Sequence, residues 1–481
     1  MRKFLLLFII ILKISVKAQT GVFVPELTLF DDKINSIMNK YEINGGQLAI
    51  TYEGRLVYNR GFGLADTLQK TLVQPYSIFR LASVSKVITS IAIMKLFENN
   101  RFKLDDKVFG TNGILNDSIY KVVKDARIYQ ITIRQLLSHS SGFNFDFANE
   151  PLWKTYEIAI ENKLTPPVYS FPIVLEWTLK NKELGFNPGT AAGYSNFGYT
   201  LLGLIIEKVT GKLYKDFVKD SILAPIGVTD MYPGKTMKED KYQNEVSYYD
   251  YPGSPLSTSI FTGIPSSVSA QYGGYNWEIM TPAGGWVASA RDLCKLLISV
   301  DRFSNKPDIL LPSTIDTMIK KSINWKDYAL GWFVTGNDYW HTGGIQGTAT
   351  VIKRNESHQI NYAILFNTLP KDYTPFYNEF IHLVTNEFFQ IKSWPKHDLF
   401  TPTNSINNSD DLNSTQIINN SNGFLSVIDF KGIADIVNYL GVKVWSGFIY
   451  PNQKINVNQF ENGVYFFKTY NFSKKFVLLK Y

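Results

Sequence analysis

A serine and a lysine three residues apart form the first candidate reactive pair of this 481-residue chain. Ser83 and Lys86 stand in the run Phe79–Lys86. A serine hydroxyl is a weak nucleophile at neutral pH, so it needs a neighbouring base and N–H donors that stabilise the developing oxyanion. The pair therefore predicts covalent chemistry, in which Ser83 attacks a carbonyl group and Lys86 accepts its proton.

The residues after this pair predict a helix that begins at it. On a helix, side chains three residues apart share a face, so Ser83 and Lys86 would meet while Ser85 points elsewhere. Ser83 would then lie in the first turn, where free N–H groups and the helix dipole favour negative charge. A Ser-x-x-Lys spacing also arises by chance, so further motifs must support it. The helical period rests on four apolar residues: Val87, Ile91, Met94 and Phe97.

A second polar group, Tyr194 and Asn196, follows the turn-rich run Asn187–Thr190 and precedes a predicted helix. A phenol beside a cationic lysine loses its proton more easily, because the positive charge favours phenolate. An asparagine amide can both donate to and accept from a substrate amide or carbonyl. The alternative is an ordinary turn tyrosine followed by a capping asparagine.

A third group, Trp340–Gly344, precedes a predicted strand that starts at Thr348. Small residues near the edge of a sheet let the backbone of a ligand approach closely. His341 is the only ionisable side chain in this group. A plain turn is the alternative reading of His341-Thr342-Gly343.

The elements that must position these groups come from both ends of the chain. Residues 45–63 predict a hairpin that turns at Glu53-Gly54. Helical patterns over Val87–Phe97 and Thr200–Val209 separate it from the later strands. The sequence therefore predicts an α+β fold, an antiparallel sheet flanked by helices with a helical insertion. Three later runs are strand-like: Ala329–Val334, Thr348–Arg354 and Asn361–Phe366.

Taken in order, the three groups resemble the motifs of the class C β-lactamase and penicillin-binding-protein superfamily, which includes D,D-peptidases and esterases. The resemblance implies a β-lactamase/transpeptidase-like domain over residues 19–400, with no metal and no cofactor. Two further stretches, Ile131–Gly142 and Pro282–Trp286, also resemble landmarks of this family. The three motifs are Ser83-Val84-Ser85-Lys86, Tyr194-Ser195-Asn196 and His341-Thr342-Gly343.

The resemblance also implies a role for each site residue. Ser83 forms an acyl-enzyme that water later releases, and Lys86 with Tyr194 removes and returns the proton. Asn196 orients the substrate, and the backbone N–H groups of Ser83 and Gly344 form the oxyanion hole. Structural support is implied for three residues: His139, Gly284 and Gly285.

His341 departs from the pattern, since typical β-lactamases of this kind carry lysine at its position. Imidazole has a reference pKa of about 6.5, so a permanent cation for a substrate carboxylate is missing. Histidine here is familiar in relatives that resemble esterases or D-amino-acid peptidases. We expect an ester or a small D-amino-acid amide or peptide as substrate. The alternatives are a β-lactamase, a D,D-carboxypeptidase, and a non-catalytic peptidoglycan- or peptide-binding protein.

The N-terminus resembles a cleaved signal peptide over residues 1–18. Arg2-Lys3 precedes the apolar run Phe4–Leu12, which is too short to span a bilayer, and Ala18 suits a cleavage site. We therefore expect export without a stable membrane anchor, and a retained anchor is the alternative.

Composition narrows the class further. The formal charge of +7 lies mainly in residues 1–18 and 424–481, so the body lacks the basic face that nucleic-acid binding requires. A hydrophobic content of 45% is ample for a large core. Cys294 is the single cysteine, which excludes an internal disulfide, and its helical apolar neighbours predict a buried residue.

The C-terminal region predicts a linker and a small all-β module. Residues 401–423 are rich in Asn and Ser, as in linkers, and residues 424–481 become strand-like. This module resembles the C-terminal sorting domain of the type IX secretion system. The resemblance implies recognition by secretion machinery and a place outside, or on the surface of, a two-membrane bacterium, reached through the periplasm. An accessory substrate- or wall-binding domain is the alternative. Three runs carry the resemblance: Asn438–Val444, Ile455–Lys468 and Ser473–Phe476.

Overall fold

The computed structural model describes residues 19–146, 149–261 and 267–401. Between 416 and 478 it describes seven short strands and residues 457, 459 and 460. The predicted signal peptide lies outside these residues. The chain divides into two units, residues 1–397 and 398–481, and each is described by itself. Among the described residues, no helix has the length and apolar character needed to cross a bilayer.

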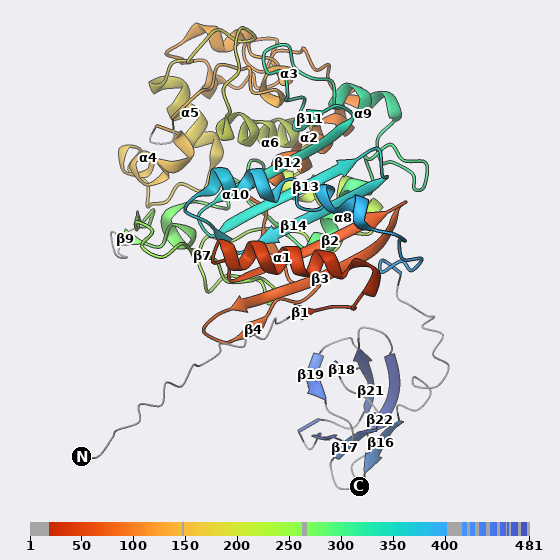
Figure 1. The fold of residues 1–481 in the computed structure, drawn as a ribbon. Helices are drawn as coiled ribbons and strands as arrows, with labels where there is room; N and C mark the ends of the chain where they lie inside the picture. Colours follow the sequence, from red (N-terminus) through yellow and green to blue (C-terminus); the bar gives the residue numbers. More distant parts are fainter. Residues whose placement is uncertain are drawn as a thin grey trace, which may run out of the picture. The chain divides into compact units, whose positions relative to one another are not determined.

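The larger unit is built on an antiparallel sheet whose strands come from both ends of the chain (Figure 1). Its centre pairs β2 with β14, so that Ala49 lies opposite Ala363. This pairing confirms the predicted α+β class. The strands follow one another in the order β1 (Gln19–Thr20), β3 (Arg55–Asp66), β2 (Gly45–Tyr52), β14 (Ile360–Phe366), β13 (Thr348–Asn355), β12 (Asp338–Ile345) and β11 (Phe333–Thr335), and β4 (Thr71–Leu72) pairs with β3.

Helices cover both faces of this sheet. On one face lie α1 (Thr28–Lys40) and α10 (Tyr373–Phe380), whose apolar side chains pack on the residues of β2 that point to that side. On the other face lies α8 (Ala290–Ile298), where the backbone N–H of Ala290 donates to Gln47 at 2.6 Å. Successive strand residues point to opposite faces, so one strand serves both layers. Cys294 of α8 is fully buried, as predicted.

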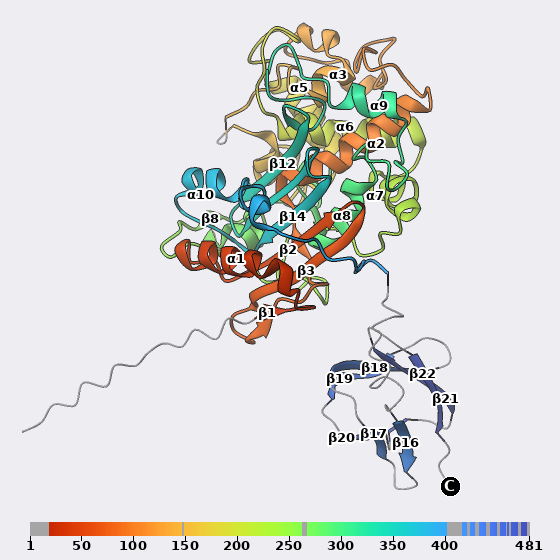
Figure 2. The same cartoon turned by 45° about the vertical axis from the view of Figure 1, so that its right-hand side comes forward.

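A helical region, inserted between β3 and β11, lies beyond the β12 side of the sheet in both views (Figures 1 and 2). The predicted helices over 87–97 and 200–209 lie within α2 and α6. Almost every side chain of α2 is buried, so this helix runs through the core. The region comprises α2 (Ser85–Glu98), α3 (Ile133–Leu137), α4 (Thr155–Glu161), α5 (Phe171–Asn181), α6 (Asn196–Thr210), α7 (Tyr214–Val218) and α9 (Pro312–Met318).

Short strands tie the connecting segments together. They form small sheets outside the main one, and two of these sheets border the nucleophile turn or the cleft described below. The pairs are β5 (Phe79–Arg80) with β10 (Trp286–Ala288), β10 with β6 (Tyr232–Pro233), β7 (Tyr249–Asp250) with β15 (Thr368–Leu369), and β8 (Ser257–Thr258) with β9 (Ser267–Val268).

Two strand predictions near the C-terminal half of the sheet need correction. The run Ala329–Val334 is strand only from Phe333, in β11. Strand β12 is not among the predicted strands, and His341 lies inside it rather than in a turn. Its two glycines and its polar residues give it low strand propensity. Pairing with β11 on one side and β13 on the other determines its conformation.

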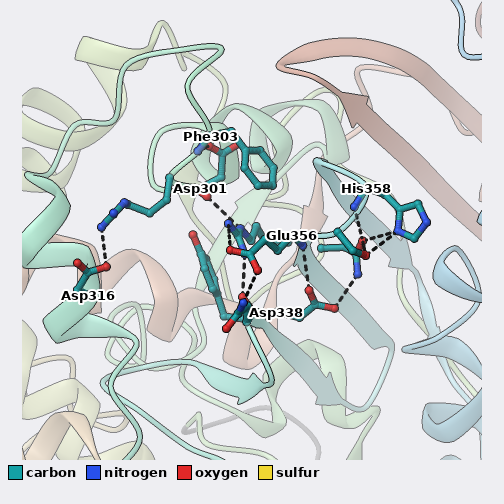
Figure 3. Close-up of polar contacts among 12 residues, drawn as sticks. Asp301, Phe303, Asp316, Asp338, Glu356 and His358 are labelled. Carbon is teal, nitrogen blue, oxygen red and sulfur yellow. Dashed lines mark hydrogen bonds and ion pairs between the residues drawn. The ribbon is translucent and has the colours of Figure 1, made fainter.

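A buried polar network fixes the end of β12 and β13 that lies farthest from their connecting turn (Figure 3). The carboxylate of Asp301 accepts from the Phe303 N–H at 2.9 Å and from the Asn361 amide at 2.7 Å. Arg354 of β13 donates to the Asp301 carbonyl at 2.9 Å. Asp338 accepts from the backbone N–H of Glu356 at 2.9 Å. These bonds hold the two strands in a fixed register, and with them the residues that β12 carries.

The smaller unit is an all-β module, as predicted. Its core gathers apolar residues from both of its sheets, including Leu425, Ile436 and Phe467. Strand β16 falls inside the stretch 401–423 that we predicted as a linker, and residues 439–442 of the run Asn438–Val444 lie outside the described residues. One sheet has the order β19 (Lys443–Ile449), β18 (Gly432–Asn438), β21 (Gly463–Thr469), β22 (Ser473–Leu478), and the other β16 (Gln416–Asn420), β17 (Phe424–Ile428), β20 (Gln453–Asn456).

Candidate active site

A cleft of about 710 Å³ opens in the larger unit and gathers the predicted site residues. The sequence separates these residues by more than 250 positions, but the fold brings them to one place because α2, α6 and β12 pack together. Lys86 lies beneath the cleft, with none of its side chain exposed. Five predicted residues line the wall: Ser83, Tyr194, Asn196, His341 and Gly344.

Ser83 lies in a short 3₁₀ turn, Ala82–Val84, that continues directly into α2. The preceding residue, Ala82, has a φ of +46°, in the left-handed region that costs a non-glycine residue about 1–3 kcal/mol. The N–H of Leu81 donates to the carbonyl of Trp286 at 2.9 Å, which ties the turn to β10. The strained turn therefore presents the Ser83 hydroxyl at the start of a helix, as the sequence predicts.

The Lys86 side chain makes three polar contacts. Its Nζ donates to Ser83 Oγ at 3.2 Å, to Asn196 Oδ1 at 2.8 Å and to the carbonyl of Ala283 at 2.7 Å. Burial lowers the pKa of Lys86 to about 7, although the charge of Glu150 raises it in part. A substantial fraction of Lys86 is therefore neutral near pH 7 and able to accept a proton from Ser83.

Tyr194 stands over the Lys86 ammonium, with 4.8 Å between Nζ and the centre of its ring. Burial raises the pKa of Tyr194 well above its ordinary value, and contact with the Ser83 side chain offsets only part of the rise. Burial therefore dominates the pKa of Tyr194, and the expected effect of the Lys86 charge on a Tyr194 phenolate stays a prediction. Desolvation disfavours both charged forms, so neutral Lys86 with neutral Tyr194 is the favoured pair.

His139 positions the segment that carries Tyr194 and Asn196. Its Nδ1 accepts from the backbone N–H of Ser195 at 3.1 Å, and its ring packs against that of Tyr194 with 4.3 Å between centres. Ser195 caps α6 by accepting from the N–H of Gly198 at 2.9 Å. The cap places Asn196 at the first position of the helix, facing Lys86.

His341 is a neutral imidazole in this site. Burial, and then the charge of Lys86, lower its pKa to about 3. Its Nδ1 donates to the Thr342 carbonyl at 2.6 Å, because that oxygen can only accept, and its Nε2 accepts from the Tyr328 hydroxyl at 3.1 Å. The cleft therefore has no cation at the position where related β-lactamases carry lysine.

The backbone of β12 faces the nucleophile turn at Gly343 and Gly344. A Cβ on Gly343 would lie 3.0 Å from the backbone nitrogen of Ser83, so the two segments are in direct contact. Ser83 and Gly344 both line the cleft, where their N–H groups can meet one substrate oxygen.

Tyr377 of α10 completes this part of the site and was not predicted. Its hydroxyl donates to the Gly343 carbonyl at 2.6 Å, and a Cβ on Gly344 would lie 2.5 Å from that hydroxyl. Glu150 beneath the site, only 4% exposed, was missed as well. Neither residue belongs to a motif, so the sequence carries no signal for them.

The remaining walls of the cleft are mostly aromatic and apolar. The stretch 232–280 contributes part of them. The walls include Trp153, Trp277, Phe333, Leu369, Tyr373, and the loop residues Asp250, Tyr251, Ser254 and Pro255.

Comparison with known proteins gives a family match. A family model described as beta-lactamase matches residues 30–386. The chain is similar to Protein flp of Staphylococcus aureus, with 26% identity over 353 residues that cover 72% of this chain and 64% of that protein. The chain thus spans less than two thirds of the length of this relative.

Two solved structures share the fold. D-amino acid amidase from Ochrobactrum anthropi SV3 aligns with a TM-score of 0.58 and 20% identity, over 76% of this chain and all of the amidase. EstCE1, a hydrolase with promiscuous acyltransferase activity, aligns with a TM-score of 0.55 and 18% identity, over 73% of this chain and 96% of that one. At these identities the likeness establishes the fold alone.

Proposed function

The chain belongs to the β-lactamase family, and we propose that it is a secreted serine hydrolase that acts through an acyl-enzyme on an ester or a small D-amino-acid amide or peptide. One observation carries the proposal. Lys86 lies 3.2 Å from Ser83 Oγ, and its pKa is lowered to about 7. A neutral amine in contact with a serine hydroxyl is the pairing that activates the nucleophile.

Acylation begins when neutral Lys86 takes the proton of Ser83 as Oγ bonds to the substrate carbonyl carbon. The carbonyl electrons move to oxygen, where the N–H groups of Ser83 and Gly344 stabilise the negative charge. The electrons then return, and the bond to the leaving group breaks. Tyr194 gives its proton to the departing oxygen or nitrogen and regains one from Lys86. An ester on Ser83 and a free alcohol or amine result.

Deacylation repeats these steps with water as the nucleophile. Lys86 with Tyr194 removes a proton from water as its oxygen bonds to the acyl carbon. The tetrahedral oxyanion again faces the N–H groups of Ser83 and Gly344. Collapse breaks the bond to Oγ, which regains its proton, and the acid leaves.

The charge of the cleft supports the choice of substrate class. Neutral His341, whose two ring nitrogens already contact Thr342 and Tyr328, offers no permanent positive charge for a β-lactam or C-terminal carboxylate. An ester or an amide without that carboxylate loses nothing at this position. Two proteins that share the fold, a D-amino acid amidase and a hydrolase with promiscuous acyltransferase activity, agree with this choice.

A comparison of the wild-type protein with Ser83→Ala tests the proposal. The substrates are p-nitrophenyl butyrate as the ester, D-alanine p-nitroanilide as the amide and nitrocefin as the β-lactam. The wild-type protein should turn over the ester or the amide faster than the β-lactam. Turnover should disappear in Ser83→Ala. Mass spectrometry should find one acyl group on Ser83. The matched control is Ser85→Ala. The Ser85 hydroxyl accepts a hydrogen bond from the Trp286 N–H and does not line the cleft, so this variant should keep turnover. Equal rates in wild-type and Ser83→Ala proteins would favour the non-catalytic binding protein.

We also propose that the chain is exported and sorted through its C-terminal module. The signal-peptide pattern of residues 1–18 and the type IX resemblance of residues 424–481 support this route. The mature protein would act outside the cell or on its surface. The intact mass of the protein recovered from the medium should correspond to a chain that starts at residue 19 and lacks the module. A module retained on that protein would favour a wall- or substrate-binding role for it.

A further inference from the structure

One wall of the cleft carries a carboxylate that the proposed reaction does not use. Asp250 ends the short strand β7, where it pairs with Leu369 of β15. The turn between β12 and β13 packs on this strand, since a Cβ on Gly347 would lie 2.7 Å from Cβ of Tyr248. Asp250 of β7 therefore lies beside the tip of the β12–β13 hairpin. The same hairpin carries Gly344 at the oxyanion position.

The Asp250 carboxylate lacks a countercharge. Its Oδ1 is buried and has no hydrogen-bond partner among the described residues. Burial raises the pKa of Asp250, while the Ser254 side chain and the Gly347 N–H lower it in part. None of the ion pairs among the described residues includes Asp250. Lys371 is the other charged residue among those lining the cleft, and its side chain is exposed to water.

Ser254 and the Gly347 N–H satisfy this partly desolvated carboxylate only in part, so a positive charge close to it would stabilise it further. Aromatic residues stand on the same wall. Trp153 and Tyr251 line the cleft with Asp250, and the ring of Tyr275 lies 5.0 Å from that of Trp153. Carboxylates combined with aromatic faces suit an ammonium group, through charge and cation–π attraction.

The position along β12 sets the distance from the reacting atoms. Gly347 lies three residues beyond Gly344, in the turn that follows β12, so their Cα atoms are at most about 10 Å apart. Tyr194 and Lys86, which return the proton to the leaving group, lie on the opposite side, towards His341. The acyl part of the substrate is therefore the part that extends towards Asp250. Two or three extended residues of a peptide cover roughly 7–10 Å.

We propose that Asp250 binds a positively charged amine at the far end of the substrate's acyl group, such as the free N-terminus of a short peptide. This inference rests on the proposed acyl-enzyme function and narrows its substrate class. The amine supplies the missing countercharge of Asp250. Its distance from the scissile carbonyl then selects the length of the acyl chain.

Binding to the inactive Ser83→Ala protein tests the proposal without turnover. The probes are 6-aminohexanoic acid anilide, in which roughly 7–10 Å separate the amine from the amide group when the chain is extended, and its N-acetyl derivative, which has no charge. Calorimetry near pH 7 should show the amine bound at least about tenfold more tightly, as expected for a charged hydrogen bond. Adding Asp250→Asn should remove this preference and leave the N-acetyl affinity unchanged.

The matched control is Asp240→Asn, an exposed carboxylate outside the lining of the cleft, which should preserve the preference. Asp250→Ser serves in place of Asp250→Asn if that variant does not fold, with the same expectation. Equal affinities for the two probes in the Ser83→Ala protein, or a preference that survives loss of the carboxylate, would overturn the proposal. Absence of hydrolysis by the wild-type protein would count against the proposed function instead, since the binding measurement does not depend on it.

Discussion

Gly343 lies directly against the carbonyl oxygen of Leu81, so that a Cβ on Gly343 would stand only 2.1 Å from that oxygen. The same carbonyl accepts a hydrogen bond from Thr350 of β13 at 2.8 Å. Strand β12 and the nucleophile turn thus pack backbone against backbone. This contact fixes where the Ser83 N–H stands relative to that of Gly344, and it leaves room for no side chain at position 343.

Gly343→Ala should therefore displace the nucleophile turn from β12. We expect kcat/KM for p-nitrophenyl butyrate to fall at least about 100-fold, since a shift of about 1 Å is enough for such a loss. The control Gly336→Ala replaces a glycine of positive φ, +59°, whose Cβ would meet open space, so it should cost about 1–3 kcal/mol of stability and keep activity. Full activity in Gly343→Ala would refute the close packing.

The protonation of Lys86 should govern the acid side of the pH profile. The reaction needs neutral Lys86, whose pKa is lowered to about 7, so kcat/KM should rise with pH through a midpoint near 7 and level off above it. His341, with a pKa of about 3, stays neutral over this range. Initial rates at low substrate concentration between pH 5 and 9 give the profile. A midpoint near the ordinary lysine pKa would contradict the buried-amine geometry.

Glu150 should change the pH midpoint of kcat/KM without contacting the substrate. Burial raises its pKa to about 8, and its charge raises the pKa of Lys86. Glu150→Gln removes the minor fraction of that charge present near pH 7, so the acid limb of kcat/KM should move slightly to lower pH while the plateau remains. The control Glu157→Gln, at an exposed position of α4, should leave the profile in place. A lower plateau with an unmoved midpoint would instead indicate a purely structural role.

Asp301 should make the fold less stable as pH rises. Burial raises its pKa from 3.8 to about 7, so the folded state holds the proton more tightly than the unfolded state. That contribution is full below about pH 4 and disappears as pH rises through about 7. Asp301→Asn should flatten this decline, because a turned Asn361 amide can offer Oδ1, which now lacks a partner.

Urea unfolding between pH 4 and 8 measures this effect. Asp316→Asn, a change at the exposed carboxylate paired with Arg302, is the control and should keep the decline. An unchanged slope in Asp301→Asn would assign the pH dependence to other groups.

The sequence by itself determined the class of fold and the three motifs, because these depend on local patterns. Strand and helix periods, the Ser83–Lys86 spacing and the helix start near Asn196 are all readable within a few residues. The absence of a permanent positive charge at position 341 also followed from the residue type, histidine. The strand prediction failed at β12, where pairing with β11 and β13 outweighs weak local propensity.

Only the tertiary structure decided which residues meet and how they ionise. The contact of Lys86 with Asn196 and Ala283 joins segments more than 100 residues apart. The directions of the Lys86 and Tyr194 pKa values follow from desolvation, which depends on every segment that covers the site. Tyr377 and Asp250 reach the cleft from α10 and β7 without any motif around them. Burial and long-range contact are properties of the folded chain, so no local pattern can encode them.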